Sequence, residues 1–238
     1  MALAPAEVEA RVQAKLASLP VVERAHWDTV LARTGFFGES GDTLRFYAVS
    51  LDSLGRPIPV MSTDQGMLFL TPSFPLSALR RGGQGERDTS ALRRGGQGER
   101  DTSAMRRGGQ GERYLRPFLL PYPVGLFVDG LGPLAANDAY ASPAVWQMFE
   151  RDLYHSPRVV WGREVNVVLA ALARRGASPA LDSLLAAVER SGLRHAELWS
   201  YRIDSAGLHP MRYGTSSDVQ LWSLTDLAVQ SLLNPHGP

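Results

Sequence analysis

The sequence predicts a mainly helical fold in which helices stack as hairpins. Apolar residues recur at the spacing of one helix face in several segments of the 238-residue chain. Helix start and end residues flank these segments, and the loops between them are alternately short and long. Because short loops join antiparallel neighbours, the long loops are expected to gather at one rim of the stack.

The first 35 residues predict two helices joined by a short loop. Pro5 suits the first turn of a helix over residues 5–19, and Gly35 suits the end of a second helix over residues 21–35. The apolar residues that share one face are Val8, Val12 and Leu16 in the first segment and Trp27, Val30 and Leu31 in the second.

Residues 44–72 predict a small β excursion followed by a helical turn. Two extended runs, 44–51 and 56–62, are separated by a polar turn at 52–55, which indicates a small hairpin or an irregular excursion. Thr63 and Asp64 then precede the apolar run 67–70, which is typical of a helix start, and Pro72 ends the turn early.

Residues 78–113 hold a tandem repeat of 13 residues that begins with ALRRGGQGERDTS. Nine Arg, three Glu and two Asp give residues 80–113 a charge of +4, so the rest of the chain carries −3 of the net +1. Each copy has one large apolar residue, too few to offset the entropy of ordering thirteen residues, so the repeats predict a flexible insertion. The alternative is an Arg-Gly tether for nucleic acid; it is less favoured because the repeats contain no aromatic residue.

The segment that follows the repeats, residues 114–146, is rich in Pro, Gly and aromatic residues. This composition predicts a long ordered loop with little regular structure. Such loops usually serve a function in compact domains, and this one delivers Asn137, Asp138 and Tyr140 as a polar cluster.

The last third of the chain predicts three helices. Residues 156–176 end with a basic pair and Gly176, residues 178–192 begin with Ser178 and Pro179 and end with Gly192, and a third helix starts at Asp218. The residues expected on the buried faces are Val165, Val168, Leu169 and Leu172, then Leu181, Leu184, Leu185 and Val188, and finally Leu221, Leu224, Ala228 and Leu232.

Composition excludes several classes of protein. The sequence has 0 Cys, which removes disulfides and thiolate chemistry. No apolar run approaches the ~18 residues that span a bilayer, and charged residues interrupt the N-terminus, so we expect a soluble cytoplasmic protein without a membrane partner. The 5 His have no metal-binding spacing, and neither GxGxxG nor a P-loop motif occurs, so no metal and no cofactor are expected.

Residues 195–222 form a polar, aromatic-rich connection that we expect to be a long loop with Glu197 near its start. Trp199, Tyr201 and Tyr213 accompany this carboxylate. Proteins grip sugars in this way, because apolar ring faces stack on aromatic side chains while hydroxyl groups need acids, amides and arginines. The interpretation of a solvated surface glutamate stays open beside it.

Three segments in order resemble the C-terminal half of the six-hairpin, (α/α)6-toroid glycosidases. These are residues 34–52 with 59–70, residues 154–176, and residues 196–233, where a Glu precedes an aromatic residue, a Gly turn and an Asp/Gln–Trp helix start. The resemblance is to the mannosylglycerate hydrolase-like and glycoside hydrolase family 63 group, which is related to amylo-α-1,6-glucosidase and trehalase domains. It implies a partial toroid over residues 1–77 and 114–238, with the insertion 78–113 between them.

The resemblance implies an inverting glycosidase acting on an α-glycosidic bond in a small glycoside or oligosaccharide, with Glu197 as the catalytic base. The residues expected to bind the sugar are Trp161 and Trp199 as stacking platforms and Arg163, Asn166, Tyr154 and His155 as polar contacts. Two departures stand out. Arg163 and Glu164 replace the small uncharged run that the family has before the Asn turn, and the family's general acid, an Asp on an earlier hairpin, has no counterpart.

The missing acid leaves open whether the chain is a glycosidase that works with a partner supplying the acid or an inactive half of one. The substitute acids available are Asp28, Asp64 and Asp138; Glu164 is a further candidate, although a helix N-terminus is expected to keep it ionised. An incomplete toroid predicts either a companion N-terminal half-domain or self-association. The alternatives to a glycosidase are a non-catalytic carbohydrate-binding or assembly module and a nucleic-acid-associated protein that uses the Arg-Gly repeats.

Overall fold

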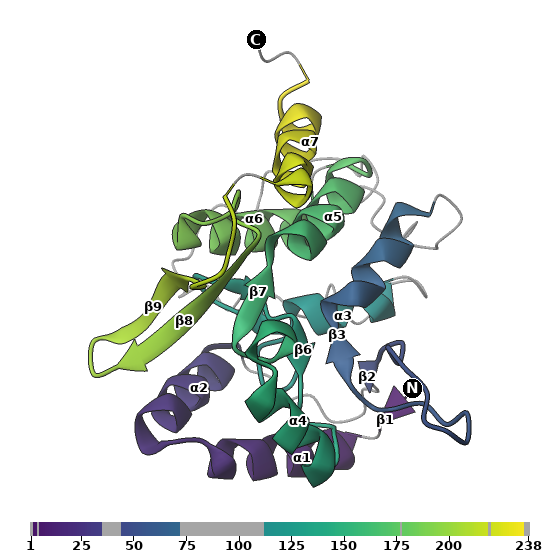
Figure 1. The fold of residues 1–238 in the computed structure, drawn as a ribbon, viewed down its shortest axis with the longest axis vertical. Coiled ribbons are helices and arrows are strands. Elements are labelled where there is room, and N and C mark those ends of the chain that lie inside the picture. The colour runs from purple at the N-terminus through teal and green to yellow at the C-terminus, as the bar shows by residue number, and fades with distance from the viewer. Residues whose placement is uncertain are drawn as a thin grey trace, which may run out of the picture.

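A computed structural model describes residues 2–3, 5–34, 44–71, 112–176, 178–218 and 220–235. The predicted repeat insertion lies outside these residues up to position 111, and the expected helix end at Gly35 also lies outside them. About half of the described residues are helical, so the prediction of a mainly helical protein is confirmed. Figure 1 shows the arrangement of the helices around several small sheets.

The helices and strands are short. The helices are α1 (Pro5–Ser18), α2 (Val21–Thr34), η2 (Thr63–Leu70), α3 (Glu112–Leu119), α4 (Pro143–Arg151), η6 (Leu153–His155), α5 (Gly162–Ala173), α6 (Pro179–Ser191), η7 (Leu221–Ser223) and α7 (Leu224–Leu233). The strands are β1 (Ala2–Leu3), β2 (Leu44–Arg45), β3 (Met61–Ser62), β4 (Phe127–Val128), β5 (Gly132–Pro133), β6 (Ala136–Asn137), β7 (Val159–Trp161), β8 (Leu198–Asp204) and β9 (Gly207–Arg212).

Local end signals set several helices as the sequence predicts. Ser178 caps α6 by accepting a hydrogen bond from the backbone N–H of Leu181, and Gly192 ends the helix with a left-handed φ of 68°. η2 starts at Thr63 as expected, as a 3₁₀ helix whose cap is Ser62. The predicted helices over 5–19 and 21–35 are α1 and α2.

The region expected to be a long loop, residues 195–222, is mainly a β-hairpin. β8 pairs with β9 on one side and with β7 on the other, so that Trp199 faces both Val160 and Arg212. The alternating side chains Trp199 and Tyr201 are buried in the core, which is the pattern of a half-buried strand. The prediction of a loop was wrong because aromatic residues were taken as ligand contacts rather than as strand formers.

Residues 114–146 also hold more regular structure than predicted. They include most of α3, three two-residue strands and the start of α4. Their polar cluster is structural: Asn137 donates to the carbonyl oxygens of Pro123 and Gly125, and Tyr140 donates to the carbonyl oxygen of Val124. Because Asn137 and Tyr140 are fully buried, they hold the turns together and do not face a ligand.

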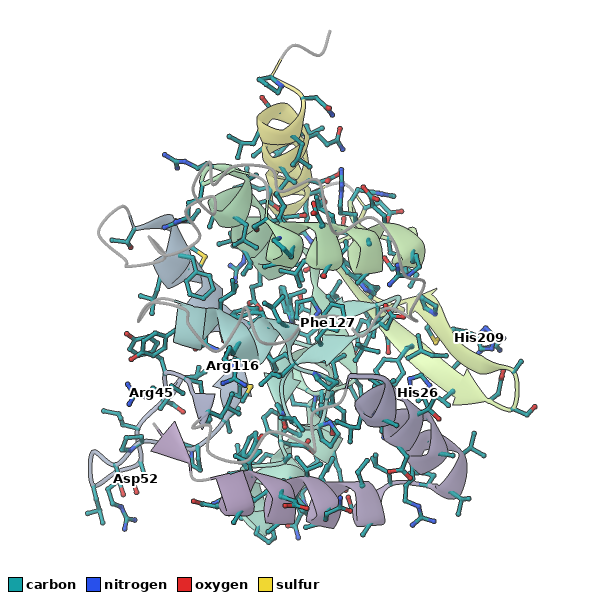
Figure 2. The ribbon with its side chains drawn as sticks, turned by 180° about the vertical axis from the view of Figure 1, so that it is seen from behind. His26, Arg45, Asp52, Arg116, Phe127 and His209 are labelled. Atoms are coloured by element: carbon teal, nitrogen blue, oxygen red, sulfur yellow. The ribbon has the colours of Figure 1, made fainter. Side chains whose placement is uncertain are left out.

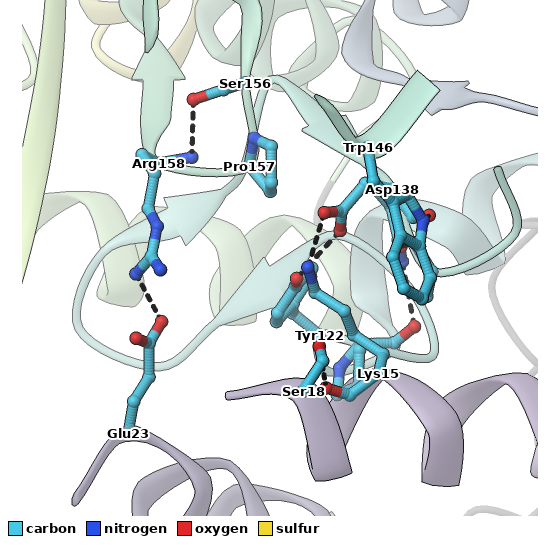
Figure 3. A network of polar contacts seen from close by, with 12 residues as sticks. Lys15, Ser18, Glu23, Tyr122, Asp138, Trp146, Ser156, Pro157 and Arg158 are labelled. Atoms are coloured by element: carbon cyan, nitrogen blue, oxygen red, sulfur yellow. Dashed lines mark hydrogen bonds and ion pairs between the residues drawn. The ribbon is translucent and has the colours of Figure 1, made fainter. Parts of the chain in front are cut away.

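Two partly buried ion pairs fasten the N-terminal helices to the middle of the chain. Figure 3 shows that Lys15 of α1 reaches the carboxylate of Asp138, which also accepts a hydrogen bond of 2.9 Å from Tyr122. In the same view, Glu23 of α2 pairs with Arg158. These two ion pairs join helices to segments more than a hundred residues away in the sequence.

One hydrophobic cluster runs from Val8 of α1 to Val229 of α7 and includes Trp27, which packs edge to face against Tyr122 and Tyr201. Figure 2 shows the side chains from behind, with Asp52 and His209 at the periphery and Phe127 near the centre.

The helix pairs do not form a ring within the described residues. The sheet β7–β8–β9 lies between the α1–α2 pair and the α5–α6 pair, and α7 projects beyond α5 and α6 (Figure 1). The face of α7 expected to be buried is exposed: Leu221 is 76% and Leu224 53% exposed, while Asp226 and Val229 face inward. On this inward face Asp226 pairs with Arg194, and Val229 packs in the core.

None of the helices in the described segments combines the length and the hydropathy that crossing a bilayer requires.

Candidate functional site

Glu197 lies where the start of β8 meets the N-terminus of α5. The backbone N–H of Gly162 donates to the carbonyl oxygen of Glu197 at 2.8 Å, and the N–H of Glu197 donates to Ser217 at 2.9 Å. A Cβ atom at position 162 would lie 2.2 Å from the carbonyl oxygen of Ala196, so only glycine fits there. Gly162 therefore lets the first turn of α5 approach the glutamate closely.

The carboxylate of Glu197 is held by several donors. Tyr154 donates through its hydroxyl to Oε1 at 2.7 Å, and the N–H of Ser217 donates to Oε2 at 3.0 Å. Partial burial raises the pKa of Glu197, but hydrogen bonds from Tyr154, Gln220 and Ser217 outweigh it and lower the pKa below its usual value. Glu197 is thus an ionised acceptor at neutral pH.

Aromatic side chains surround Tyr154. The ring of Trp161 meets it edge to face at 4.6 Å, and Tyr213 lies 6.1 Å away between ring centres. The imidazole of His155 stacks on Trp161 at 5.7 Å. Asp152 fixes this arrangement because it caps η6 by accepting hydrogen bonds from the backbone N–H of Tyr154 and from Nδ1 of His155.

Arg163 carries positive charge into the same region. Its guanidinium lies over the ring of Trp222 at 4.4 Å and over Trp161 at 5.9 Å, and its Nη2 donates to Oε1 of Glu164 at 3.1 Å. The guanidinium is also close enough to Tyr154 to lower its pKa, although burial and Glu197 raise that pKa more, to about 12. Nε of Arg163 has no hydrogen-bond partner among the described residues.

Glu164 is a second carboxyl group at the N-terminus of α5, and it is 6% exposed. Thr63, at the start of η2, donates to its Oε2. The pKa of Glu164 is raised to about 7, mainly by burial and next by the neighbouring Asp64, while Thr63 and Arg163 lower it. The helix N-terminus was expected to keep Glu164 ionised, but desolvation and a like charge oppose the helix dipole, so a pKa of about 7 leaves Glu164 only partly ionised at neutral pH.

The structure brings five of the predicted site residues together and separates two. Glu197, Tyr154, His155, Trp161 and Arg163 are linked by the contacts described above. Trp161 is only 8% exposed, so it supports Tyr154 and His155 more than it offers a free ring face.

Trp199 and Asn166 have structural roles instead. Trp199 is 0% exposed and donates through its indole N–H to Leu131 at 3.0 Å, so it cannot stack on a sugar. Asn166 is buried and donates to the carbonyl oxygen of Arg194 and the hydroxyl of Thr225, which ties α5 to the start of α7.

The three aspartates considered as substitute acids lie in different places. Asp138 pairs with Lys15, and Asp28 is exposed on α2. Of the three, only Asp64 interacts with a residue near Glu197, namely Glu164.

Sequence reasoning placed Tyr213 near Glu197 but missed Thr63, Ser217 and Gln220 as residues of this region. The pairing of Trp199 with Arg212 across the hairpin places Tyr213 beside Leu198, and recognising β8 and β9 as strands would have predicted it. Thr63 and Glu164 are 101 positions apart, and no local signal joins them.

No group of three or more His, Cys, Asp or Glu side chains in the described segments could hold a metal ion. Comparison with protein-family models, with curated proteins and with solved structures finds no match for this chain.

Proposed function

We propose that this chain binds a carbohydrate at the cluster around Glu197 and hydrolyses an α-glycosidic bond of a small glycoside or oligosaccharide with inversion. The observation that supports this best is the Glu197 carboxylate, which Tyr154, Ser217 and Gln220 keep ionised beside aromatic rings and an arginine. Sugar sites combine these groups, since ring faces pack on aromatic side chains and hydroxyl groups pair with charged ones.

Inverting hydrolysis assigns Glu197 the role of base. An ionised carboxylate accepts a proton from a water molecule as that water attacks the anomeric carbon, while an acid on the other side protonates the leaving oxygen. An acid and a base need carboxyl groups whose pKa values are shifted apart. The pKa of Glu164 is raised and the pKa of Glu197 is lowered.

We also propose that the chain folds as part of an (α/α)6 glycosidase, as the sequence resemblance implies. In that interpretation α5, α6 and α7 belong to the last hairpins of a toroid, and a companion half-domain or a second copy of the chain completes it. The exposed leucines of η7 and α7, including Leu221 and Leu227, are the apolar surface that such a neighbour would cover.

Carbohydrate binding without hydrolysis is the second candidate. The specific observation in its favour is that protein donors already occupy both oxygens of Glu197, because such bonds weaken a carboxylate as a base. A nucleic-acid role through the Arg-Gly repeats remains a prediction, since the repeats lie outside the described residues.

Hydrolysis of α-linked aryl glycosides and disaccharides by the purified chain tests the proposal, with NMR used to identify the first anomer released. We expect the inverted β-anomer, and for Glu197→Gln a loss of activity of about 10²–10⁴-fold with sugar binding retained. Glu150→Gln is the matched control, because Glu150 is exposed on α4.

The other outcomes separate the candidates. A wild-type chain that binds these sugars without hydrolysing them supports the binding module. Absence of both binding and hydrolysis, with the chain alone and at high concentration, rejects both carbohydrate functions.

A further inference from the structure

The C-terminal helix α7 is apolar on its inner and on its outer face. The inner face packs on α5, with Val229 in the core and Asp226 paired with Arg194. The outer face carries leucines whose exposed fractions lie between 39% and 76%, namely Leu221 of η7 and Leu224, Leu227 and Leu232 of α7. A surface helix usually has charged or polar residues opposite its core face, whereas a helix that is apolar all round is a buried one. The exposed leucines therefore indicate a neighbour that covers α7.

The outer face of α7 also carries no charge. Asp226 is the only charged residue in the sequence from position 219 to position 235, and it is buried on the inner face. The helix α6 also packs on α5 and differs in this respect, because it exposes Asp182, Glu189 and Arg190. The outer face of α7 thus lacks the charged side chains that the solvent-facing side of its neighbour has.

We infer that the outer face of η7 and α7 is the contact surface of a homodimer, in which α7 packs antiparallel against α7 of a second copy about a two-fold axis. The inference names which of the two neighbours considered above covers the leucines. It does not depend on binding or hydrolysis of a carbohydrate.

The absence of charge on this surface fits a second copy of the chain. In a two-fold pair the same surface meets itself, so that a charge near the axis would face a like charge. The outer face of α7 avoids this conflict. The antiparallel arrangement also sets the N-terminal end of each helix beside the C-terminal end of the other, and the opposite partial charges of these ends attract each other.

The tandem repeats of the same chain match this surface less well. Residues 80–113 hold nine Arg, three Glu and two Asp, and each repeat has one large apolar residue. Covering the leucines with such a segment would remove its charges from water, and the outer face of α7 offers no opposite charge to compensate for that loss. An apolar, uncharged surface of the same kind is the better complement.

The position and length of the leucine stripe allow the pairing. Leu221 and Leu232 lie at its two ends, roughly 17 Å apart along the helix axis, and Leu227 lies near its middle. A two-fold axis close to Leu227 brings Leu221 of each copy toward Leu232 of the other. In both ribbon views α7 projects from the rest of the molecule, so a second copy can reach it (Figures 1 and 2).

The size of the surface sets the expected strength of the dimer. The partly exposed leucines offer on the order of 400 Å² of apolar surface in each copy, so a pair buries on the order of 1,000 Å² together with the rim of the contact. This area lies at the low end of specific interfaces. We therefore expect a reversible dimer with a dissociation constant of roughly 1–100 µM.

Sedimentation of the full chain without sugar, from about 1 to about 300 µM, tests the inference by detecting a monomer–dimer equilibrium. Leu227→Glu should weaken the dimer by at least about tenfold, because it sets two like charges beside the axis. Leu54→Glu is the matched control and should leave the equilibrium unchanged. Leu54 is 73% exposed in the turn 52–55, and Asp52 of that turn lies at the opposite end of the molecule from α7 (Figure 2).

Leu227→Lys separates a lost contact from a lost fold. Leu227→Glu and Leu227→Lys should each be mainly monomeric, and their mixture should dimerise at least about tenfold more tightly than either variant alone, because a glutamate then meets a lysine at the axis. Misfolded variants would not rescue each other. A mixture that stays monomeric while the wild type dimerises would overturn the antiparallel pairing.

The remaining outcomes also decide the question. A wild-type chain that stays monomeric at the highest concentration overturns the inference and leaves a companion half-domain as the neighbour of α7. Association beyond a dimer, or equal weakening by Leu54→Glu, contradicts a two-fold contact at this face. The carbohydrate function fails separately: a dimer that neither binds nor hydrolyses sugars retains the inference, whereas a monomer that hydrolyses them retains only the function.

Discussion

Asp138 and Glu164 are both nearly buried acids, 4% and 6% exposed, and their neighbours differ in charge. Asp138 meets the ammonium group of Lys15 and the hydroxyl of Tyr122. Glu164 meets Arg163 and Thr63, but also the second carboxyl group of Asp64. Asp138 is paired with a cation and joins α1 to the core, whereas Glu164 lies beside another carboxyl group that repels its charged form.

The difference shows how a buried acid serves either structure or chemistry. A buried carboxylate paired with a cation and hydrogen-bonded on its other oxygen has a fixed charge and strongly resists change. A buried carboxyl group beside another acid changes its protonation near neutral pH. Substitutions at the two positions should therefore have different effects on stability and on its pH dependence.

Lys15→Met breaks the compensated pair. It leaves the charge of Asp138 buried without its cation, and such losses destabilise a protein by about 3–5 kcal/mol. Urea unfolding of the variant measures the change in the free energy of unfolding. Arg151→Met, at an exposed position of α4, is the control and should change that free energy by less than about 0.5 kcal/mol. Equal effects of the two substitutions would show that the Lys15–Asp138 ion pair contributes no more to stability than an exposed arginine does.

Glu164 should make the free energy of unfolding depend on pH. Burial and Asp64 raise its pKa from 4.5 to about 7, so the folded chain keeps a proton that the unfolded chain releases. Stability therefore falls as pH rises from about 4.5 to about 7, by about 3 kcal/mol, and changes little from this group above that window.

Glu164→Gln should remove this part of the pH dependence. Urea unfolding at pH 5 and pH 8 is the measurement, and the difference between the two free energies of unfolding should be about 2.5 kcal/mol smaller in the variant than in the wild type. Glu150→Gln should leave the difference unchanged. The same pH dependence in Glu164→Gln and in the wild type would mean that Glu164 is ionised in the folded chain at both pH values.

Gly162→Ala tests the close approach of α5 to Glu197. The new methyl group would lie 2.2 Å from a backbone oxygen of Ala196, so the strand or the helix must shift. Overpacking of this kind destabilises by about 1–3 kcal/mol. Gly214→Ala is the matched control, because nothing lies within 4 Å of the added atom. Thermal unfolding compares the two, and a Gly162→Ala protein as stable as Gly214→Ala would exclude a tight fit.

Local signals in the sequence were sufficient where one helix could form by itself. Ser178, Pro179 and Gly192 set the limits of α6 through capping and a left-handed turn, which depend only on nearby residues. The first hairpin and the start of η2 followed from similar signals. These predictions did not require knowledge of the tertiary structure.

Contacts between distant segments could not be predicted in the same way. Glu197 was identified from its aromatic neighbours, and Tyr154 does contact it, but Trp199 belongs to the core because β8 pairs with both β7 and β9. The apolar residues of η7 and α7 predicted a buried face, but Asp226, which pairs with Arg194, and Val229 face inward instead. The raised pKa of Glu164 depends on η2, a segment about a hundred residues earlier in the chain.

Trp222→Ala should have the smallest effect on stability and tests the side of the site that faces solvent. The indole is 38% exposed and its main recorded partner is the guanidinium of Arg163, 4.4 Å away. Cation–π contacts at exposed positions contribute about 0.5–1 kcal/mol, so the free energy of unfolding should fall by about that amount. Leu221→Ala, at a 76% exposed neighbour, is the control for loss of apolar surface alone. If Leu221→Ala destabilises the protein more than Trp222→Ala does, the stacking on Arg163 contributes nothing to stability.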